Sequence, residues 1–480
     1  MRRNRKVKIV ATLGPASNNE SMIEKLFLAG ADVFRINMSH TDHDMMRFLV
    51  KTIRAIEKKL GRPIGILADL QGPKLRVGEF ANGKVDLVVG QTFTLDNKNI
   101  PGDNKRVLLP HKEIFDAVKP GERLLIDDGK LELLAQKCTH ESIECTVIAG
   151  THISDRKGVS LPDTILGVGA MTEKDHKDLL AVLEEPVDWI ALSFIQRPED
   201  IAEARKISKG KVAILSKIEK PQAVRRIDEI IDLSDAVMVA RGDLGVEMPL
   251  EAVPGIQMDI IKLCRRAGKP VVVATQMLES MINAPVPTRA EVSDVATAVY
   301  EGADAIMLSA ESAAGLYPEE AVHTMDKIAC KIERDSNYRA MIDAQHPEPE
   351  PTGADAISLA ARQIAETLNL STIVAYTASG ATGVRASRER PMPPIIALSP
   401  ITETARRLAL VWGLHCVVTD DAHDLDDMVE RAAAIAMHEG YCVPGDRVIV
   451  TAGVPLGTPG ATNMLRIAYV TKNDGKTSLL

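Results

Sequence analysis

Aromatic residues are scarce in this sequence, since only 3% of its 480 residues are Phe, Trp or Tyr. Its cores must therefore be packed mainly from Val, Ile, Leu, Ala and Met. No stretch reaches the roughly 18 consecutive apolar residues of a membrane-spanning helix, so no membrane association is expected. The basic start of the chain, residues 2–8, is not followed by the apolar segment that a signal peptide needs.

An excess of positive charge is also missing, as is any regular cysteine spacing. The formal net charge is −8, which leaves no broad basic surface for nucleic acid. A phosphate ligand would therefore need a focused positive pocket. The six cysteines show no CxxC spacing. Scattered free thiols in a long chain are typical of a reducing compartment, so we expect a cytoplasmic protein.

Two stretches of the chain alternate β-prone runs with helical periodicity, which is the pattern of a parallel α/β sheet. They lie at 1–70 and 169–345 and together hold about eight strand–helix units, the number in a (β/α)₈ barrel. Between them, at 71–168, short β runs alternate with turns such as Asn82-Gly83 and Pro120-Gly121. The sequence therefore predicts a TIM barrel with an all-β domain inserted after its third strand.

A Pro- and Glu-rich stretch at 346–351 has the composition of a linker, because its prolines cannot continue a helix. Strand and helix patterns alternate again beyond it. We therefore expect a separate, smaller α/β domain over 346–480.

Polar side chains follow nearly every predicted barrel strand, at the end where barrels bind their ligands. Each one alone is more often structural, because strand ends meet solvent. Together they point to one rim. They are Thr12, Arg35, Asn37, Ser39, His40, Asp69, Ser193, Lys217, Glu219, Arg241, Asp243, Thr275, Ser309 and Glu311.

Glu219 and Asp243 follow neighbouring strands, and one or two carboxylates are the usual protein contribution to a Mg²⁺ site. The alternative is that both form salt bridges with Lys217 and Arg241. Lys217 could act as a point charge on a phosphoryl group, and the forked guanidinium of Arg35 suits phosphate or carboxylate. This combination predicts a divalent metal beside an anionic substrate.

Eight segments of the sequence closely resemble pyruvate kinase and occur in the order found in that family. They are TLGPAS (12–17), FRINMSH (34–40), QGPKLR (71–76), SKIEK (216–220), MVARGDLGVE (238–247), ATQMLESM (274–281), PTRAEVSDVATAV (287–299) and MLSAES (307–312). The resemblance covers essentially the whole chain. It implies transfer of the phosphoryl group of phosphoenolpyruvate to ADP, giving pyruvate and ATP in glycolysis, with Mg²⁺ or Mn²⁺ as cofactor and a homotetramer as the assembly.

The resemblance also assigns roles to residues of the rim. Lys217 would stabilise the phosphoryl group during transfer, and Arg35 would bind the substrate phosphate. Glu219 and Asp243 would ligate Mg²⁺. The backbone of Gly242 and Asp243 would hold the substrate carboxylate.

Further residues complete this carried-over site. Thr275 would hold the carboxylate together with Gly242, and Ser309 and Glu311 match positions near the face on which enolpyruvate is protonated, through water. The nucleotide would contact Arg76, Lys157, Asn37 and His40. Because Arg76 and Lys157 lie in the inserted domain, that domain is expected to be a β-barrel lid that excludes water when it closes.

The chain departs from the family pattern at a monovalent-cation site. Asn37, Ser39, Asp69 and the carbonyl of Leu70 match this site in K⁺-dependent members. Those members carry Glu where this chain has Lys74, and the ammonium group could take the place of K⁺ as a fixed charge. We therefore expect K⁺ to be dispensable; the alternative is a solvated Lys74 beside a working K⁺ site.

A hydroxyl- and glycine-rich turn in the C-terminal domain could cradle a phosphate at a helix N-terminus. It contains Thr377, Ser379, Gly380 and Thr382. The resemblance implies a regulatory domain that binds a phosphorylated allosteric effector. A purely structural turn is nearly as compatible with the residues.

Two other functions fit part of the sequence. Another metal-dependent barrel enzyme acting on phosphoenolpyruvate or 2-oxo acids would explain Arg35, Glu219 and Asp243, but not the inserted or C-terminal domain. A metabolite-binding regulator without activity would need a missing catalytic group, and none is missing.

Overall fold

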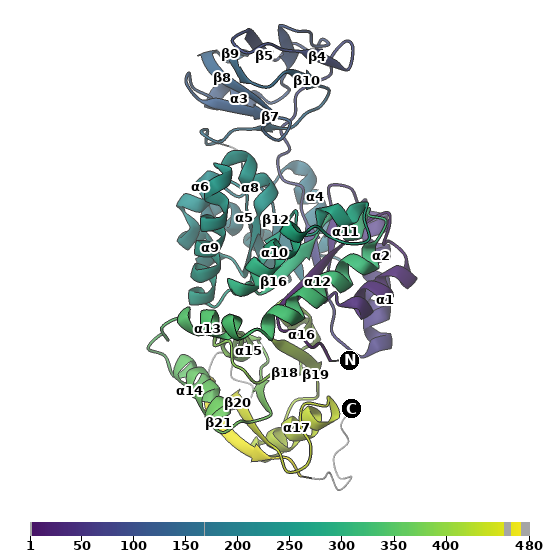
Figure 1. The fold of residues 1–480 in the computed structure, drawn as a ribbon, viewed down its shortest axis with the longest axis vertical. Helices are drawn as coiled ribbons and strands as arrows, with labels where there is room; N and C mark the ends of the chain where they lie inside the picture. The colour runs from purple at the N-terminus through teal and green to yellow at the C-terminus, as the bar shows by residue number, and fades with distance from the viewer. Residues whose placement is uncertain (1, 168, 456–461, 472–480) are drawn as a thin grey trace.

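A closed parallel barrel lies between two smaller domains in the computed structural model, which describes residues 2–167, 169–455 and 462–471 (Figure 1). The strands of the barrel follow the order β1-β16-β15-β14-β13-β12-β3-β2 around the ring. The barrel strands β3 and β12 are neighbours in this ring, although the whole inserted domain lies between them in the sequence. The chain therefore leaves the barrel after β3, builds the inserted domain and returns at β12. The predicted TIM barrel with an insertion after its third strand is confirmed.

The barrel strands are short, and most are buried along their whole length. Their bounds are β1 (Lys8–Leu13), β2 (Val33–Asn37), β3 (Gly65–Asp69), β12 (Trp189–Leu192), β13 (Ala213–Ile218), β14 (Ala236–Ala240), β15 (Val271–Ala274) and β16 (Ala305–Leu308). Every residue of β1, β3 and β14 is buried. Parallel strands covered on both faces need such continuous apolar runs, which is why the sequence shows them.

Helices surround the barrel, and several begin at a polar residue whose side chain accepts a backbone N–H. Asn19, Asp42, Thr172 and Thr288 cap helices in this way. The helices are α1 (Glu20–Ala29), α2 (His43–Leu60), α4 (Glu173–Val182), α5 (Pro198–Ser208), α6 (Pro221–Arg225), α7 (Ile227–Leu233), α8 (Arg241–Glu247), α9 (Val253–Ala267), α10 (Arg289–Tyr300), α11 (Ala310–Ala313), α12 (Pro318–Glu333) and α13 (Ser336–Ala344). Short 3₁₀ turns η1 (Leu250–Ala252) and η2 (Glu279–Ile282) lie among them.

The inserted domain is built almost entirely from strands, as predicted. One sheet has the order β11-β7-β8-β9-β5-β6, and β10 pairs with β4. The elements are β4 (Lys84–Asp86), β5 (Thr92–Asp96), β6 (Arg106–Leu108), β7 (Arg123–Ile126), β8 (Leu131–Cys138), β9 (Ser142–Ala149), β10 (His152–Ser154), β11 (Val159–Ser160) and the short helix α3 (Lys112–Ala117). Phe93, Leu133 and Ile143 belong to a core of its own, separate from that of the barrel.

The C-terminal domain is an α/β sheet in the order β19-β18-β17-β20-β21. Its elements are α14 (Gly353–Thr367), β17 (Thr372–Tyr376), α15 (Ala381–Arg388), β18 (Ile395–Ser399), α16 (Thr402–Leu408), β19 (Leu414–Val418), α17 (Leu425–His438), β20 (Arg447–Gly453) and β21 (Thr462–Tyr469). The antiparallel strand β21 is an addition to the strands expected from the sequence. The division at residues 70/71, 168/169 and 345/346 stays a prediction.

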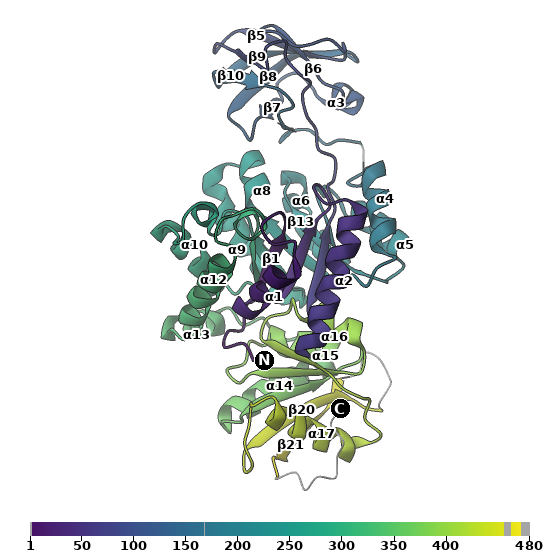
Figure 2. The same cartoon turned by 90° about the vertical axis from the view of Figure 1, so that its right-hand side faces the viewer.

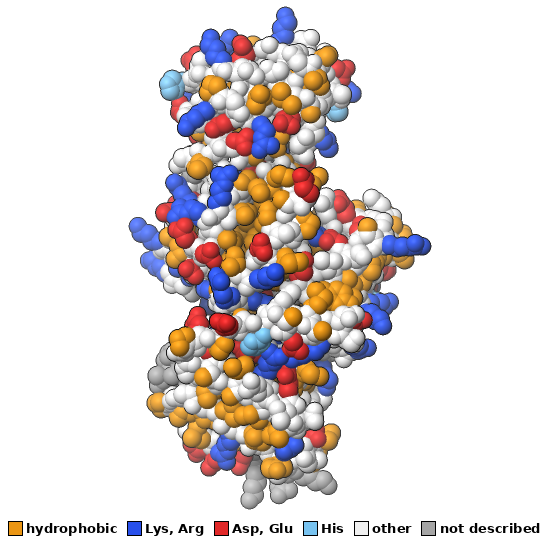
Figure 3. Space-filling view, turned by 60° about the vertical axis from the view of Figure 1, so that its left-hand side comes forward, with side chains coloured by type: hydrophobic (Ala, Val, Ile, Leu, Met, Phe, Trp, Pro, Cys, Tyr) orange, Lys and Arg blue, Asp and Glu red, His pale blue; other side chains and the backbone are white. Residues whose placement is uncertain are grey.

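The C-terminal domain packs on the amino-terminal end of the barrel. Figure 2 shows the end of α2 beside α16, where Arg406 Nε donates to Glu57 Oε1 at 2.9 Å. The carboxyl ends of the strands are therefore left open toward the inserted domain. On the face shown in Figure 3, Lys and Arg side chains are interspersed with Asp and Glu, without a single broad basic area.

Candidate active site

Lys217 lies at the centre of a buried charged cluster on the carboxyl rim of the barrel. Its Nζ is 2.8 Å from Ser193 Oγ, 2.8 Å from Glu219 Oε1 and 3.5 Å from Asp69 Oδ1. Asp69 ends β3, Ser193 follows β12, and Lys217 and Glu219 lie at the carboxyl end of β13. The parallel register of these neighbouring strands brings the groups together. Burial alone would lower the pKa of Lys217, but Asp69 and Glu219 raise it above its ordinary value.

Arg35 joins this cluster from β2. Its Nε donates to Asp69 Oδ2 at 2.7 Å and its Nη1 to Thr12 Oγ1 at 3.1 Å. Although burial would raise the pKa of Asp69, the charges of Lys217 and Arg35 lower it, so this carboxylate stays ionised. Asp69 thus forms ion pairs with both Arg35 and Lys217 and holds their side chains at the carboxyl rim of the barrel.

Glu219 has two buried carboxylate oxygens with different surroundings. Its Oε2 accepts from the backbone N–H of Phe194 at 2.6 Å. Its buried Oε1 lies 2.8 Å from the Lys217 ammonium and has no other hydrogen-bond partner among the described residues. Burial raises the pKa of Glu219 to about 7, and the nearby charge of Asp243 adds to this effect. Two adjacent carboxylates, one buried and one exposed, fit a divalent cation that keeps water ligands.

The alternative in which both carboxylates are consumed by salt bridges holds only in part. Lys217 does pair with Glu219. Arg241, however, pairs with Asp294 on α10 rather than with Asp243. Asp243 remains exposed at the first turn of α8.

Gly242 and Thr275 lie side by side at the ends of β14 and β15. The Gly242 N–H donates to Thr275 Oγ1 at 2.7 Å, and the hydroxyl donates to the Ala274 carbonyl at 2.6 Å. A Cβ added to Gly242 would come within 3.4 Å of that hydroxyl oxygen. This distance is an ordinary van der Waals contact, so the hydrogen bond between amide and hydroxyl does not by itself require glycine at position 242.

Ser309 and Glu311 follow β16, and the contacts of Glu311 are with the backbone. Its oxygens accept from the N–H groups of Leu278, at 3.1 Å, and Ser309, at 2.7 Å. Burial raises the pKa of Glu311. Within the part of the chain that the structure describes, neither side chain forms a hydrogen bond or ion pair with Lys217 or Glu219, so this pair borders the cluster rather than belonging to it.

The residues expected at the monovalent-cation site are adjacent to the cluster. Asn37 Oδ1 accepts from the Ser39 N–H at 3.1 Å, and the Leu70 carbonyl accepts from Ser193 Oγ at 2.8 Å. Lys74 is half-buried, and burial together with the charges of Arg76 and Lys217 lowers its pKa. The charges of Asp243 and Asp69 act on this pKa in the opposite direction but are outweighed.

The inserted domain carries two of the expected nucleotide contacts, and both make bonds within it. Arg76 Nη1 donates to the Arg156 carbonyl at 2.7 Å, and Lys157 Nζ lies 2.9 Å from Asp127. The exposed His40 lies on the barrel side; burial, with the charges of Lys74, Arg35 and Arg76, lowers its pKa.

Asp175 ties together the two chain segments that connect barrel and inserted domain. Its Oδ1 accepts from the Gly72 N–H at 3.1 Å and its Oδ2 from the Thr172 N–H at 2.8 Å. Asp175 is fully buried. Both connecting segments are therefore hydrogen-bonded to the first turn of the same helix, α4.

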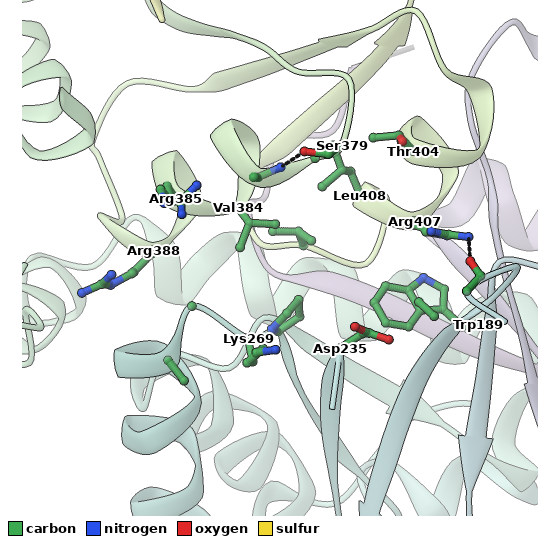
Figure 4. Close-up of a pocket in the computed structure, with 18 of the residues that line it drawn as sticks. Trp189, Asp235, Lys269, Ser379, Val384, Arg385, Arg388, Thr404, Arg407 and Leu408 are labelled. Carbon is green, nitrogen blue, oxygen red and sulfur yellow. Dashed lines mark hydrogen bonds between the residues drawn. The ribbon is translucent and has the colours of Figure 1, made fainter. Parts of the chain in front are cut away.

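The hydroxyl-rich turn of the C-terminal domain is largely self-paired. Thr377 Oγ1 accepts from the Gly380 N–H at 2.9 Å, and the hydroxyls of Thr382 and Thr462 are 2.8 Å apart. Ser379 and Gly380 border a cavity of about 460 Å³ between this domain and the amino-terminal end of the barrel. Figure 4 shows Arg385 and Arg388 on one side of it and Lys269 on the other.

Two contributors to the site had no role assigned from the sequence. Ser193 bridges Lys217 and the Leu70 carbonyl, and Phe194, at a φ of 55°, donates its N–H to Glu219. The position of Ser193 after a barrel strand was a signal for the first. The Phe194 contribution could not be predicted, because every residue except proline has a backbone N–H and the residue type does not show which one will donate.

The comparisons with known proteins agree with this geometry. The family model "Pyruvate kinase, barrel domain" matches residues 4–322, and "Pyruvate kinase, alpha/beta domain" matches residues 355–468. A pyruvate kinase of Methylorubrum extorquens is 60% identical over 98% of this chain and 99% of its own length, and one of Agrobacterium vitis is 48% identical over 97% and 99%.

A solved structure of a pyruvate kinase from Cryptosporidium parvum superimposes with a TM-score of 0.92 at 34% identity, covering 97% of this chain and 96% of the other. Since the barrel and the C-terminal domain both match, the comparisons favour pyruvate kinase over another barrel enzyme acting on phosphoenolpyruvate or 2-oxo acids. The chain belongs to the pyruvate kinase family.

Proposed function

We propose that the cluster around Lys217 is the site where this phosphotransferase acts. Its reaction is that of the family, transfer of the phosphoryl group of phosphoenolpyruvate to ADP with formation of pyruvate and ATP, the last step of glycolysis. The observation that supports the site most strongly is the Lys217 ammonium group between Asp69 and Glu219 at the open rim.

Lys217 and Arg35 supply the positive charge for phosphoryl transfer. During transfer, negative charge spreads over the phosphoryl oxygens, so fixed cations at those oxygens lower the barrier. Lys217 stays protonated because Asp69 and Glu219 raise its pKa against the effect of burial. Arg35 is held by Asp69 and Thr12, which directs its remaining N–H groups toward the substrate phosphate.

The carboxylate of the substrate is assigned to the Gly242 N–H, the Asp243 backbone and the Thr275 hydroxyl. These groups lie at adjacent strand ends, next to Glu219. Ser309 and Glu311, which border the cluster, are assigned to the protonation of enolpyruvate through water. The phosphoryl group, the carboxylate and the carbon that is protonated are thus each assigned to different residues.

Pyruvate kinases in general depend on Mg²⁺ and K⁺. Here Glu219 and Asp243 would hold Mg²⁺ or Mn²⁺, which would neutralise phosphate charge when bound. For the monovalent site, assigned to Asn37, Ser39, Asp69 and the Leu70 carbonyl, the half-buried Lys74 supports a K⁺-independent enzyme. Its ammonium group interacts electrostatically with Asp69 and would supply the fixed charge in place of K⁺.

Nucleotide contacts are assigned to Arg76 and Lys157 of the lid and to Asn37 and His40 of the barrel. Arg76 already influences the pKa of His40 electrostatically, which supports a nucleotide site between lid and rim. Lys157 would exchange its ion pair with Asp127 for nucleotide phosphate. Closure about the Asp175 anchor would exclude the water that could otherwise take the phosphoryl group.

Regulation, assembly and location extend the proposal. A phosphorylated effector would bind the C-terminal domain near Thr377, Ser379, Gly380 and Thr382, and the enzyme would work as a homotetramer in the cytoplasm. Free thiols at all six cysteines are compatible with a reducing compartment. Among the described residues, no helix is long and apolar enough to cross a membrane.

An assay of ATP formation tests the proposal. The purified protein, given phosphoenolpyruvate, ADP and Mg²⁺, should form equal amounts of ATP and pyruvate. Release of inorganic phosphate without ATP, or no consumption of phosphoenolpyruvate, would refute it.

A further inference from the structure

Arg241 forms a two-pronged ion pair with Asp294 beside the carboxylate subsite. Nη1 lies 2.5 Å from Oδ1 and Nη2 lies 2.6 Å from Oδ2. Arg241 is the first residue of α8 and Asp294 lies within α10, so the pair connects two helices that are distant in sequence. The planar guanidinium fork matches the two carboxylate oxygens.

The same guanidinium group also holds the backbone at Thr275. Nη2 donates to the Thr275 carbonyl at 2.7 Å. Ala240 of β14 pairs with Ala274 of β15, so Arg241 and Thr275 are the first residues beyond two neighbouring strand ends. This register explains why an arginine at position 241 reaches that carbonyl.

The backbone at Thr275 is in a conformation that needs support. Thr275 has a φ of 73° and the following Gln276 a φ of 54°. A β-branched residue rarely adopts the left-handed region, because its side chain crowds the backbone there. In this conformation the Thr275 hydroxyl accepts from the Gly242 N–H and donates to the Ala274 carbonyl.

We propose that Arg241, fixed by Asp294, is a positioning residue that stabilises the left-handed turn at Thr275. It thereby keeps the Thr275 hydroxyl and the Gly242 N–H side by side, each in a hydrogen bond that one with the substrate carboxylate would replace. The inference rests on the proposed function, because it concerns the same carboxylate subsite. A lysine at position 241 could not replace the arginine. Its single ammonium group cannot bind both Asp294 oxygens and the Thr275 carbonyl at once, as the planar guanidinium does.

Oxalate is a suitable probe, because it carries two adjacent oxygen-bearing groups like those of enolpyruvate. Its Kd in the presence of Mg²⁺ is measured by titration calorimetry. Arg241→Lys should weaken oxalate binding by about 10- to 100-fold, as expected for misplacement of binding groups by a fraction of an ångström. The KM for phosphoenolpyruvate should rise similarly, while the KM for ADP stays unchanged.

Asp294→Asn provides a second variant that keeps the shape of the pair. It should weaken oxalate binding in the same direction but by less, and it decides the question if Arg241→Lys does not fold. Arg226→Lys is the matched control. Arg226 also makes a two-pronged pair, with Glu229 at 2.9 and 2.6 Å, on the exposed surface.

A double-mutant cycle separates positioning from a general structural role. If Arg241 acts through the Thr275 hydroxyl, then Arg241→Lys should change the oxalate Kd by less than about twofold in a Thr275→Ala background. Additive effects of the two substitutions, or a lower melting temperature with an unchanged oxalate Kd, would overturn the positioning role of Arg241 but not the proposed function. Failure of the unmodified protein to bind oxalate would overturn both.

Discussion

Replacement of Lys217 by alanine should abolish phosphoryl transfer while sparing the protonation of enolpyruvate to a greater extent. The side chain is buried, with its Nζ 2.8 Å from Glu219 and 3.5 Å from Asp69, in surroundings where a fixed charge acts strongly. Loss of one donor or cation at a transferring group costs about 10²- to 10⁵-fold in kcat. We therefore expect ATP formation to fall by at least about 10³-fold.

Two assays follow the two chemical steps separately. Formation of ATP from phosphoenolpyruvate and ADP reports phosphoryl transfer. Exchange of the methyl protons of pyruvate with solvent deuterium, followed by NMR, reports proton transfer to and from the enolate. Exchange should fall by less than about 10²-fold, because proton transfer moves less charge onto the position of Lys217.

A stability control is needed because the variant leaves Asp69 and Glu219 without their shared counter-ion. Breaking a buried pair in this way costs about 3–5 kcal/mol. Lys8→Met is the matched control, since Lys8 is a buried lysine of a barrel strand whose Nζ donates to the Leu414 carbonyl, away from the rim. If both steps of the Lys217 variant fall by the same factor while Lys8→Met stays active, the assigned role is wrong.

Three more predictions follow from the charges. Activity of the unmodified enzyme should rise by less than about twofold when KCl replaces a tetramethylammonium salt, and a large rise would contradict the role of Lys74. The variant Lys74→Glu places a negative charge at this position, so its activity should depend strongly on K⁺. Glu219→Gln should weaken Mg²⁺ binding by at least about tenfold, measured by calorimetry without substrate, and an unchanged affinity would remove Glu219 from the metal site. Burial lowers the pKa of His415 from 6.5 to about 4, outweighing the Glu439 carboxylate 2.9 Å from its Nε2, which favours the charged form. Its neutral form therefore stabilises the fold above pH 6.5, and this contribution is lost as the pH falls toward 4; His415→Gln should show a smaller drop in melting temperature between pH 7 and pH 5, and an equal drop would count against the argument.

The charged cluster could be predicted from the sequence because strand ends in a parallel barrel obey one geometric rule. Apolar runs fix where each strand lies, and the polar residues near or just beyond its carboxyl end must then lie on the same rim. Arg35, Asp69, Lys217 and Glu219 are brought together in this way. No knowledge of loop conformation was needed for these four.

Residues whose position depends on loop or helix geometry were beyond the same rule. Asp294 is 53 residues from Arg241 and lies on a helix, and no periodic pattern relates the two. The donor on Glu219 is a backbone N–H placed by a left-handed residue, Phe194, which side-chain types do not reveal. Strand β21 pairs antiparallel at the sheet edge, and its alternation of exposed and buried residues is irregular.

The balance of charge at the rim explains why so many ionised groups can be buried there. Arg35, Lys74 and Lys217 are offset by Asp69, Glu219 and Asp243, so the six groups carry no net charge when all are ionised. Burial raises the pKa of Glu219, so its ionised form is the least stable of the six, and within the described residues its Oε1 forms an ion pair with Lys217 alone. A divalent cation shared with Asp243 would relieve that oxygen and turn a neutral rim into one with an excess of two positive charges. An anionic substrate would then be attracted to the rim chiefly after the metal has bound, which makes metal binding and substrate binding cooperative for electrostatic reasons alone.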